Sequence, residues 1–248
     1  MKKTIDIIYE DRWLVAIDKP SGLMSVSGGK TGTETAYSLV NDYITHKYNG
    51  RKKAHVLHRL DRDTSGVLVF AKDWQTKMAM TDNWNGNIRE RRYVAVLDGV
   101  PEHEKGHIES WLTENDKNFM VYSSLKDNGG ELAVTDYEVL KAEGQYPDGK
   151  KTDDMIQSAD RRPAGDGRGP AIRRSLVAFN LSTGRKNQIR VHAAAHLHCP
   201  VAGDSKYGNG KSAKRLCLHA KALGFIHPVT RRLVRITSNT PRFFNSLV

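Results

Sequence analysis

The alternation of apolar and polar residues along the chain predicts many short strands and few helices. Residues 67–71, Val-Leu-Val-Phe-Ala, form a continuous apolar run, which is typical of a buried strand. Residues 35–47 place apolar side chains three and four positions apart, as on one face of a helix. A second helix is expected over 73–82, capped by Asp73, with a turn at 83–87. Further strand-like segments are 5–9, 13–17, 89–99, 107–112, 119–122, 131–140, 175–181, 215–220 and a final hairpin of 225–228 with 231–236.

Two segments lack this patterning. Residues 25–33 are rich in Gly and Ser and are expected to form a loop. Residues 144–169 are poor in apolar residues and rich in Gly, Pro, Asp, Lys and Arg. That composition predicts a long flexible loop, partly disordered, which RNA binding could order.

Length and charge narrow the class of protein. The 248 residues allow one large domain or two small ones. The net charge is +11, which favours a polyanionic partner, most simply nucleic acid, over the alternative of scattered surface charge. The basic segments 51–53, 91–92 and 185–186 are the ones expected to contact phosphates. The two cysteines have no disulfide-type spacing, and the chain shows neither a signal peptide nor an apolar run long enough to cross a bilayer. We therefore expect a cytoplasmic protein.

The polar stretch 58–66, His-Arg-Leu-Asp-Arg-Asp-Thr-Ser-Gly, is the strongest candidate for chemistry. It precedes the buried strand directly, and polar residues held on a loop by a rigid strand are where active sites tend to be built. The alternative is a solvated turn with internal ion pairs, which composition alone would favour.

The sequence of this stretch resembles the catalytic loop of the RluA-type pseudouridine synthases, His-Arg-Leu-Asp-x-x-Thr-Ser-Gly, at all seven specified positions. Further segments resemble that family in the same order: 9–22, 91–99, 183–192, 200–208 and 215–220. The resemblance therefore covers nearly the whole chain. It implies an α+β fold with a large mixed, mostly antiparallel sheet flanked by helices. It also implies a single catalytic domain over 1–248, without the small N-terminal S4 RNA-binding domain that many relatives carry.

The resemblance assigns a role to each candidate residue. Asp61 is implied to be the nucleophilic carboxylate, Tyr93 to lie against the target uracil, and Arg190 to pair with Asp61. A cation beside a buried carboxylate keeps that carboxylate ionised for attack. Arg59 is implied to fill the space of a flipped-out uridine. The other residues expected to bind substrate are His58, Thr64, Arg185, Ile189 and Leu218, the last as an apolar wall under the base.

One position departs from the family pattern. Asn187 stands where the commonest form of the motif Thr-Gly-Arg-x-His-Gln-Ile-Arg-x-His has its first His. Asn keeps a hydrogen-bonding side chain but loses titration. We expect activity to survive this change, since that His is not the nucleophile.

The implied function is isomerisation of uridine to pseudouridine in stem-loops of ribosomal or transfer RNA by a monomer. Attack on the sugar, attack on uracil carbon 6 and proton abstraction from the sugar all remain open as routes. Two rival classes are a binding protein that has lost catalysis and an aspartate-dependent hydrolase of a small molecule. Complete motifs argue against the first, and the net charge argues against the second.

Metal and cofactor sites are not expected. His192, His196, His198 and Cys199 cluster in sequence, and two histidines four apart on a helix could bind zinc. No second ligand pair has finger-like spacing, however, and the cluster lies within a motif that needs no metal. His219 and His227 are expected to be structural. Neither a phosphate-binding Gly-x-x-x-x-Gly-Lys sequence nor a dinucleotide fingerprint is present.

Overall fold

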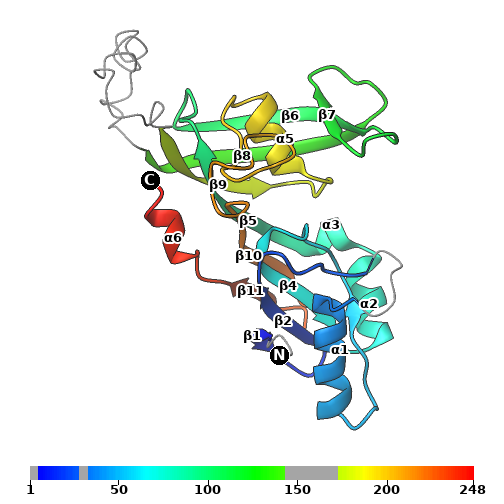
Figure 1. Cartoon of the computed structure of the whole chain (residues 1–248). Coiled ribbons are helices and arrows are strands. Elements are labelled where there is room, and N and C mark those ends of the chain that lie inside the picture. The colour runs from blue at the N-terminus through cyan, green and yellow to red at the C-terminus, as the bar shows by residue number, and fades with distance from the viewer. Residues whose placement is uncertain (1–4, 28–32, 143–172) are drawn as a thin grey trace, which may run out of the picture.

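The computed structural model describes residues 5–27, 33–142 and 173–248. Within these residues the chain forms one 11-stranded sheet with helices on its faces (Figure 1). The strands are β1 (Asp6–Glu10), β2 (Leu14–Lys19), β3 (His55–Val56), β4 (Ser65–Ala71), β5 (Ile88–Asp98), β6 (Lys105–Glu114), β7 (Val121–Ser124), β8 (Glu131–Ala142), β9 (Arg174–Leu181), β10 (Leu218–Ile226) and β11 (Leu233–Thr237). The helices are α1 (Ala36–Lys47), α2 (Trp74–Thr81), α3 (Trp84–Asn87), α5 (Gln188–Ala195) and α6 (Arg242–Asn245).

The strand order is β1-β2-β4-β10-β5-β9-β8-β6-β7, with β11 added to β10 and β3 added to β4. The pairing of β4 with β10 is parallel, and the other pairings between these strands are antiparallel. The architecture is the α+β class with a mixed, mostly antiparallel sheet, as the family resemblance implies. Because β10 and β5 follow each other in the sheet but not in the chain, segments distant in sequence meet at its middle.

The β2–β4 end of the sheet is covered on both faces, which explains the continuous apolar run of β4. Val15, Ile17, Leu68 and Phe70 point to one face, where α1 packs with its buried side chains Ala36, Val40 and Ile44. The alternate residues of the same strands point to the other face, where Met80 of α2 packs. All seven residues of β4 are buried. A strand buried on both faces carries no polar alternation.

Helix capping follows the sequence closely. Thr35 precedes α1 and its hydroxyl accepts a hydrogen bond from the backbone N–H of Ser38 at 3.0 Å. Asp73 caps α2 in the same way, accepting from the N–H of Thr76 at 2.8 Å. Each cap satisfies a backbone donor at a helix start, which fixes where the helix begins.

The β6–β8 end of the sheet forms a second core with α5. Ile189 and Ala193 of α5 pack with Leu97, Val177 and Phe179 from the central strands. Figure 1 shows β6, β7, β8 and α5 as one half of the molecule and β1, β2 and β4 with α1, α2 and α3 as the other. Strands β5, β9 and β10 run between these halves.

Several local predictions need correction. The predicted turn at 83–87 is instead the short helix α3 (Trp84–Asn87), capped by Asn83. Strand β7 begins at Val121 rather than at Phe119, whose φ of +55° places it outside a strand. The predicted strands 215–220 and 225–228 are one strand, β10. Neither β3 nor α6 was predicted, and the predicted loop 144–169 lies outside the described residues.

Candidate active site

The loop between β3 and β4 carries Asp61, and a buried lysine binds its backbone. Lys19 ends β2, is fully buried, and donates a hydrogen bond from its ammonium group to the carbonyl oxygen of Arg62 at 2.9 Å. Burial lowers the pKa of Lys19 to about 8. The Ser25 hydroxyl donates to the carbonyl oxygen of Leu60 at 2.6 Å and accepts from its N–H at 3.0 Å. These contacts fix the loop backbone, so Asp61 projects from a rigid support.

Gly66 brings this loop against β10. Its φ of +113° is unfavourable for residues with a side chain, and a Cβ there would lie 2.2 Å from the carbonyl oxygen of Ala220. The two residues are partners in the parallel pairing of β4 and β10. Only glycine permits this approach, which places the start of β10, with Leu218, next to the Asp61 loop.

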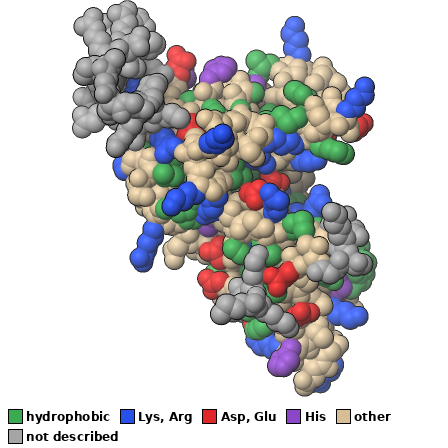
Figure 2. All heavy atoms as spheres, in the orientation of Figure 1, with side chains coloured by type: hydrophobic (Ala, Val, Ile, Leu, Met, Phe, Trp, Pro, Cys, Tyr) green, Lys and Arg blue, Asp and Glu red, His purple; other side chains and the backbone are tan. Residues whose placement is uncertain are grey.

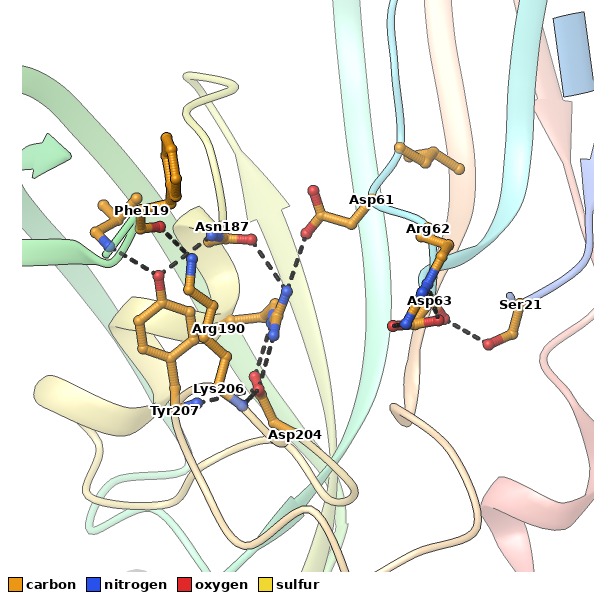
Figure 3. Close-up of polar contacts among 12 residues, drawn as sticks. Ser21, Asp61, Arg62, Asp63, Phe119, Asn187, Arg190, Asp204, Lys206 and Tyr207 are labelled. Atoms are coloured by element: carbon orange, nitrogen blue, oxygen red, sulfur yellow. Dashed lines mark hydrogen bonds and ion pairs between the residues drawn. The ribbon is translucent and has the colours of Figure 1, made fainter. Parts of the chain in front are cut away.

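Asp61 and Arg190 meet across the two halves of the sheet. A terminal nitrogen of Arg190, Nη1, lies 3.4 Å from Oδ2 of Asp61. The Asp61 side chain is 38% exposed, whereas that of Arg190 is 13% exposed. Figure 3 shows Arg62 and Asp63 of the same loop pointing away from this pair. Asp61 is thus the carboxylate of the loop that faces both the cation and solvent.

Arg190 is oriented by Asp204, which the sequence did not single out. Its Nε and Nη2 each donate to one oxygen of the fully buried Asp204 carboxylate at 2.7 Å (Figure 3). Burial alone would lower the pKa of Arg190, but the hydrogen bonds and charges of Asp204 and Asp61 raise it. A two-pronged pair fixes the plane of the guanidinium. Nη1 is therefore left pointing toward Asp61.

Asn187 supports the same nitrogen of Arg190. Its side-chain oxygen accepts from Nη1 at 3.0 Å, and its amide nitrogen donates to the Tyr207 hydroxyl at 3.2 Å. Asn187 precedes α5 with a φ of +55°, a conformation that Asn tolerates better than most residues. The departure from the family's His thus replaces a titrating group with one that binds Arg190 directly.

The wall beside Asp61 is aromatic and apolar. Tyr93 lies on β5, paired with Phe179 of β9 and Ala220 of β10. Burial raises the pKa of Tyr93 to about 12, and the nearby charge of Asp61 adds to this. The phenol therefore stays protonated at neutral pH.

His58 and Thr64 are held inside the loop. The Nε2 of His58 accepts a hydrogen bond from the backbone N–H of Val69 at 3.1 Å, and its ring stacks on Trp84 with centroids 5.4 Å apart. Burial, with a contribution from Arg91, lowers the pKa of His58 to about 4. Thr64 is 3% exposed. His58 is accordingly neutral, and one of its ring nitrogens is already engaged by the fold.

Arg59 and Arg185 differ in how firmly they are held. Arg59 is exposed, and it has no hydrogen bond or ion pair within the described parts of the chain. Arg185 pairs with Glu131 at 2.7 Å and donates to the carbonyl oxygen of Leu132 at 2.9 Å. Arg59 is therefore free to move toward a ligand, whereas Arg185 already has partners.

One cleft of about 790 Å³ unites these residues. All the residues expected to act in catalysis or to bind the substrate line it: His58, Arg59, Asp61, Thr64, Tyr93, Arg185, Ile189, Arg190 and Leu218. The basic segment 51–53 does not line the cleft, and Lys52 instead donates to the carbonyl oxygen of Arg12 at 2.7 Å. The sequence did not point to Lys19 and Asp204, although both lie within the segments that resemble the family.

A buried polar network supports the loop from the far side. His219 bridges Ser65 at the start of β4, 2.9 Å from its Nδ1, and Ser238, 3.1 Å from its Nε2. Ser238 in turn donates to Asp18 at 2.6 Å. Burial lowers the pKa of His219 to about 4, so the ring stays neutral. This arrangement explains His219 as a structural residue.

The His192 cluster is a hydrogen-bonded network between α5 and the sheet. His192 is fully buried, with Thr135 at 2.9 Å and Ser110 at 3.0 Å from its two ring nitrogens. His196 contacts Ser123 at 2.7 Å. Within the described residues, no three His, Cys, Asp or Glu side chains gather as a metal site. The same residues contain no helix long and apolar enough to span a membrane.

Comparison with known proteins identifies the family. Residues 13–195 match the family described as RNA pseudouridylate synthase. The ribosomal large subunit pseudouridine synthase C of Rickettsia bellii is 30% identical over 244 residues, which cover 96% of this chain and 69% of that protein. The tRNA pseudouridine synthase C of Haemophilus ducreyi is 33% identical over 249 residues, which cover 94% and 90%.

Solved structures agree on the fold. The human RNA Pseudouridylate Synthase Domain Containing 4 superposes with a TM-score of 0.69 and 21% identity, covering 98% of this chain and 91% of that one. The human Domain Containing 1 protein gives the same TM-score at 22% identity. The chain therefore belongs to the RNA pseudouridylate synthase family, in its RluA-type branch, and is an isomerase that acts on RNA.

Proposed function

We propose that the protein converts uridine to pseudouridine in ribosomal or transfer RNA, with Asp61 as nucleophile and with the target uridine flipped into the cleft. The observation that carries this proposal is the placement of Asp61. Its carboxylate is partly exposed in the cleft, 3.4 Å from a cation that Asp204 holds in position. A carboxylate that is both accessible and electrostatically supported suits nucleophilic attack.

The reaction moves one bond and one proton. The bond from uracil N1 to ribose C1′ breaks, the base turns, and a bond from C5 to C1′ forms, while C5 loses a proton and N1 gains one. No atom enters or leaves overall. As a nucleophile, Asp61 attacks either ribose C1′ or uracil C6. Abstraction of a sugar proton, with Asp61 as a base, is the alternative that a carboxylate at this place also allows.

Tyr93 suits support of the flipped base. An aromatic ring can stack on any base, whatever its identity. Its phenol, protonated at neutral pH, offers a hydrogen-bond donor rather than a base. Leu218 and Ile189 line the same cleft and add apolar walls. The base is therefore held by stacking and packing while it turns.

The Arg59 side chain is suited to fill the space that a flipped-out base leaves in the RNA stack. Flipping costs a few kcal/mol of unstacking, which a stacking side chain can offset. The guanidinium of Arg59 is planar and exposed at the cleft. The net charge of +11 suits the polyanionic substrate. Lys and Arg side chains occur over much of the face seen in Figure 2, with acidic side chains among them.

Mapping pseudouridines in RNA from cells with and without the gene tests the proposal. Both rRNA and tRNA enzymes occur among relatives of about 30% identity, so both RNA classes belong in the map. We expect at least one rRNA or tRNA site to be lost and to be restored by the purified protein in vitro. An unchanged map, together with no isomerisation in vitro of either RNA class, would contradict the proposal.

A further inference from the structure

Arg91 is a buried cation in the wall of the cleft. It lies on β5 two residues before Tyr93, so both side chains point to the same face of the sheet, and both line the cleft. Arg91 is 8% exposed. Arg92, between them, points to the opposite face and does not line the cleft. Arg91 therefore faces the cleft and Arg92 does not, although the two arginines are adjacent in the sequence.

The hydrogen-bond partners of Arg91 are neutral. Its Nη2 donates to the side-chain oxygen of Asn85 at 2.8 Å, and its Nη1 donates to the carbonyl oxygen of Ser182 at 3.3 Å. These use two of the five N–H donors of a guanidinium. No carboxylate forms an ion pair with Arg91 anywhere in residues 5–27, 33–142 and 173–248. A buried charge without a counter-charge is costly, so such a site favours an anion.

The neighbouring cations of the cleft are different in this respect. Arg185 pairs with Glu131, Lys186 with Glu114, and Arg190 with Asp204. Their charges are already balanced by the protein. Arg59 also lacks an ion pair in the described residues, but it is exposed to solvent. Arg91 is buried, so a ligand would have to balance its charge.

A second cavity of about 320 Å³ begins at Arg91. Asn85, Arg89, Glu90, Asn180 and Ser182 line it, and Arg91 also lines the main cleft. The Glu90 carboxylate pairs with Arg235 at 2.6 Å, so its charge is balanced within the protein. The polar groups of this cavity include a second arginine and the amides of two asparagines, which can bind a nucleotide's phosphate, sugar or base edges. Arg91 is therefore at the junction between the proposed uridine site and this cavity.

We propose that Arg91 binds one of the two phosphodiesters flanking the target uridine, and that the neighbouring nucleotide enters the second cavity. This rests on the proposed function, which puts the uracil against Tyr93. Residues two apart on a strand are separated by roughly 7 Å, a span that one nucleotide covers between base and phosphate. Arginine is suited to phosphate because its planar donors match the phosphate oxygens.

Removing the charge from single phosphates tests this contact. The probe is a stem-loop with a uridine that the wild-type protein converts, made with a methylphosphonate at the linkage 5′ or 3′ of that uridine. Wild-type affinity should fall roughly tenfold or more for one of the two RNAs, because a hydrogen bond to a charged group is lost. Arg91→Gln should bind unmodified RNA more weakly by the same factor and lose nothing further from the methylphosphonate.

Arg92→Gln is the matched control, since it removes the same charge from the next residue on the opposite face. It should keep the full methylphosphonate effect. The proposal is overturned if Arg91→Gln and wild type lose equal affinity from the methylphosphonate. It is also overturned if neither flanking linkage matters to wild type, a result that does not depend on how well the variant folds. Conversion of unmodified RNA by wild type is scored separately and tests the proposed function itself.

Discussion

Arg190 joins two carboxylates that have different tasks. Asp204 is fully buried and fixes the guanidinium, while Asp61 is partly exposed and faces the cleft. The resemblance predicts the pairing of Arg190 with Asp61, and the structure places them 3.4 Å apart. Asp204 could not be found from local pattern, because an aspartate in a Gly- and Ser-containing loop is also ordinary turn chemistry.

Replacing Asp204 tests whether it positions Arg190. Asp204→Asn leaves the buried Arg190 without its main counter-charge, so the free energy of unfolding should fall by about 3 kcal/mol. Turnover should also fall, with little change in RNA affinity, because Arg190 no longer presents Nη1 to Asp61. Urea denaturation and single-turnover kinetics measure the two effects. Full turnover by the folded variant would show that Asp204 has only a structural role.

Arg59 should act on stacked substrates more than on unstacked ones. Arg59→Ala should slow conversion of a uridine in a stem-loop more than conversion in a linear oligonucleotide, because only the first must be unstacked. Lysine should rescue poorly, since it lacks the planar face. Single-turnover rates on matched RNAs give the comparison. An equal loss on both RNAs would argue against a role in flipping.

Elements with clear periodicity were predictable and short ones were not. Helix α1 and strands β4, β5 and β9 follow directly from their apolar spacing and caps. Helix α3 has four residues, too few for a helical period to be distinguished from a turn. Strand β3 has two residues and exists through its pairing with β4. Such elements are set by tertiary contacts, which the local sequence does not contain.

The site required pairings between distant segments. Residues of the Asp61 loop, β5, α5 and β10 line one cleft only because β10 inserts between β4 and β5. No local pattern predicts that insertion. The motif resemblance could name these residues together because family motifs record the outcome of the fold rather than its cause.

Gly66 should be the most sensitive position of the β4–β10 junction. Gly66→Ala adds a Cβ 2.2 Å from a backbone oxygen of Ala220 in a left-handed conformation, so the free energy of unfolding should fall by about 2–5 kcal/mol. Gly50→Ala is the control, because Gly50 has a φ of +77° but no atom within 4 Å of the added Cβ. It should cost only about 1 kcal/mol. Equal losses in urea denaturation would contradict the close approach.

Buried neutral histidines should make the whole molecule acid-sensitive. Burial lowers the pKa values of His58, His192 and His219 to about 4 each. In the unfolded chain all three take up protons near pH 6.5, whereas in the folded state they do not until about pH 4. Stability should therefore fall as the pH drops through this window, with a slope on the order of 4 kcal/mol per pH unit.

Equilibrium unfolding in urea between pH 7.5 and 4.5 measures this slope. His219→Asn removes one titrating group, so its slope should be shallower than that of wild type by roughly 1 kcal/mol per pH unit. An unchanged slope in both His192→Asn and His219→Asn would mean that other groups set the acid sensitivity.

Conversion of uridine should depend on the Asp61 carboxylate, and loss of tritium from RNA labelled at uracil C5 measures that dependence. Asp63→Asn is the matched control, because Asp63 lies two residues away in the same loop and points away from Arg190 (Figure 3). Wild type and Asp63→Asn should release tritium, and Asp61→Asn should release none while still binding RNA. Release by a verified Asp61→Asn preparation at a rate near wild type would contradict the account.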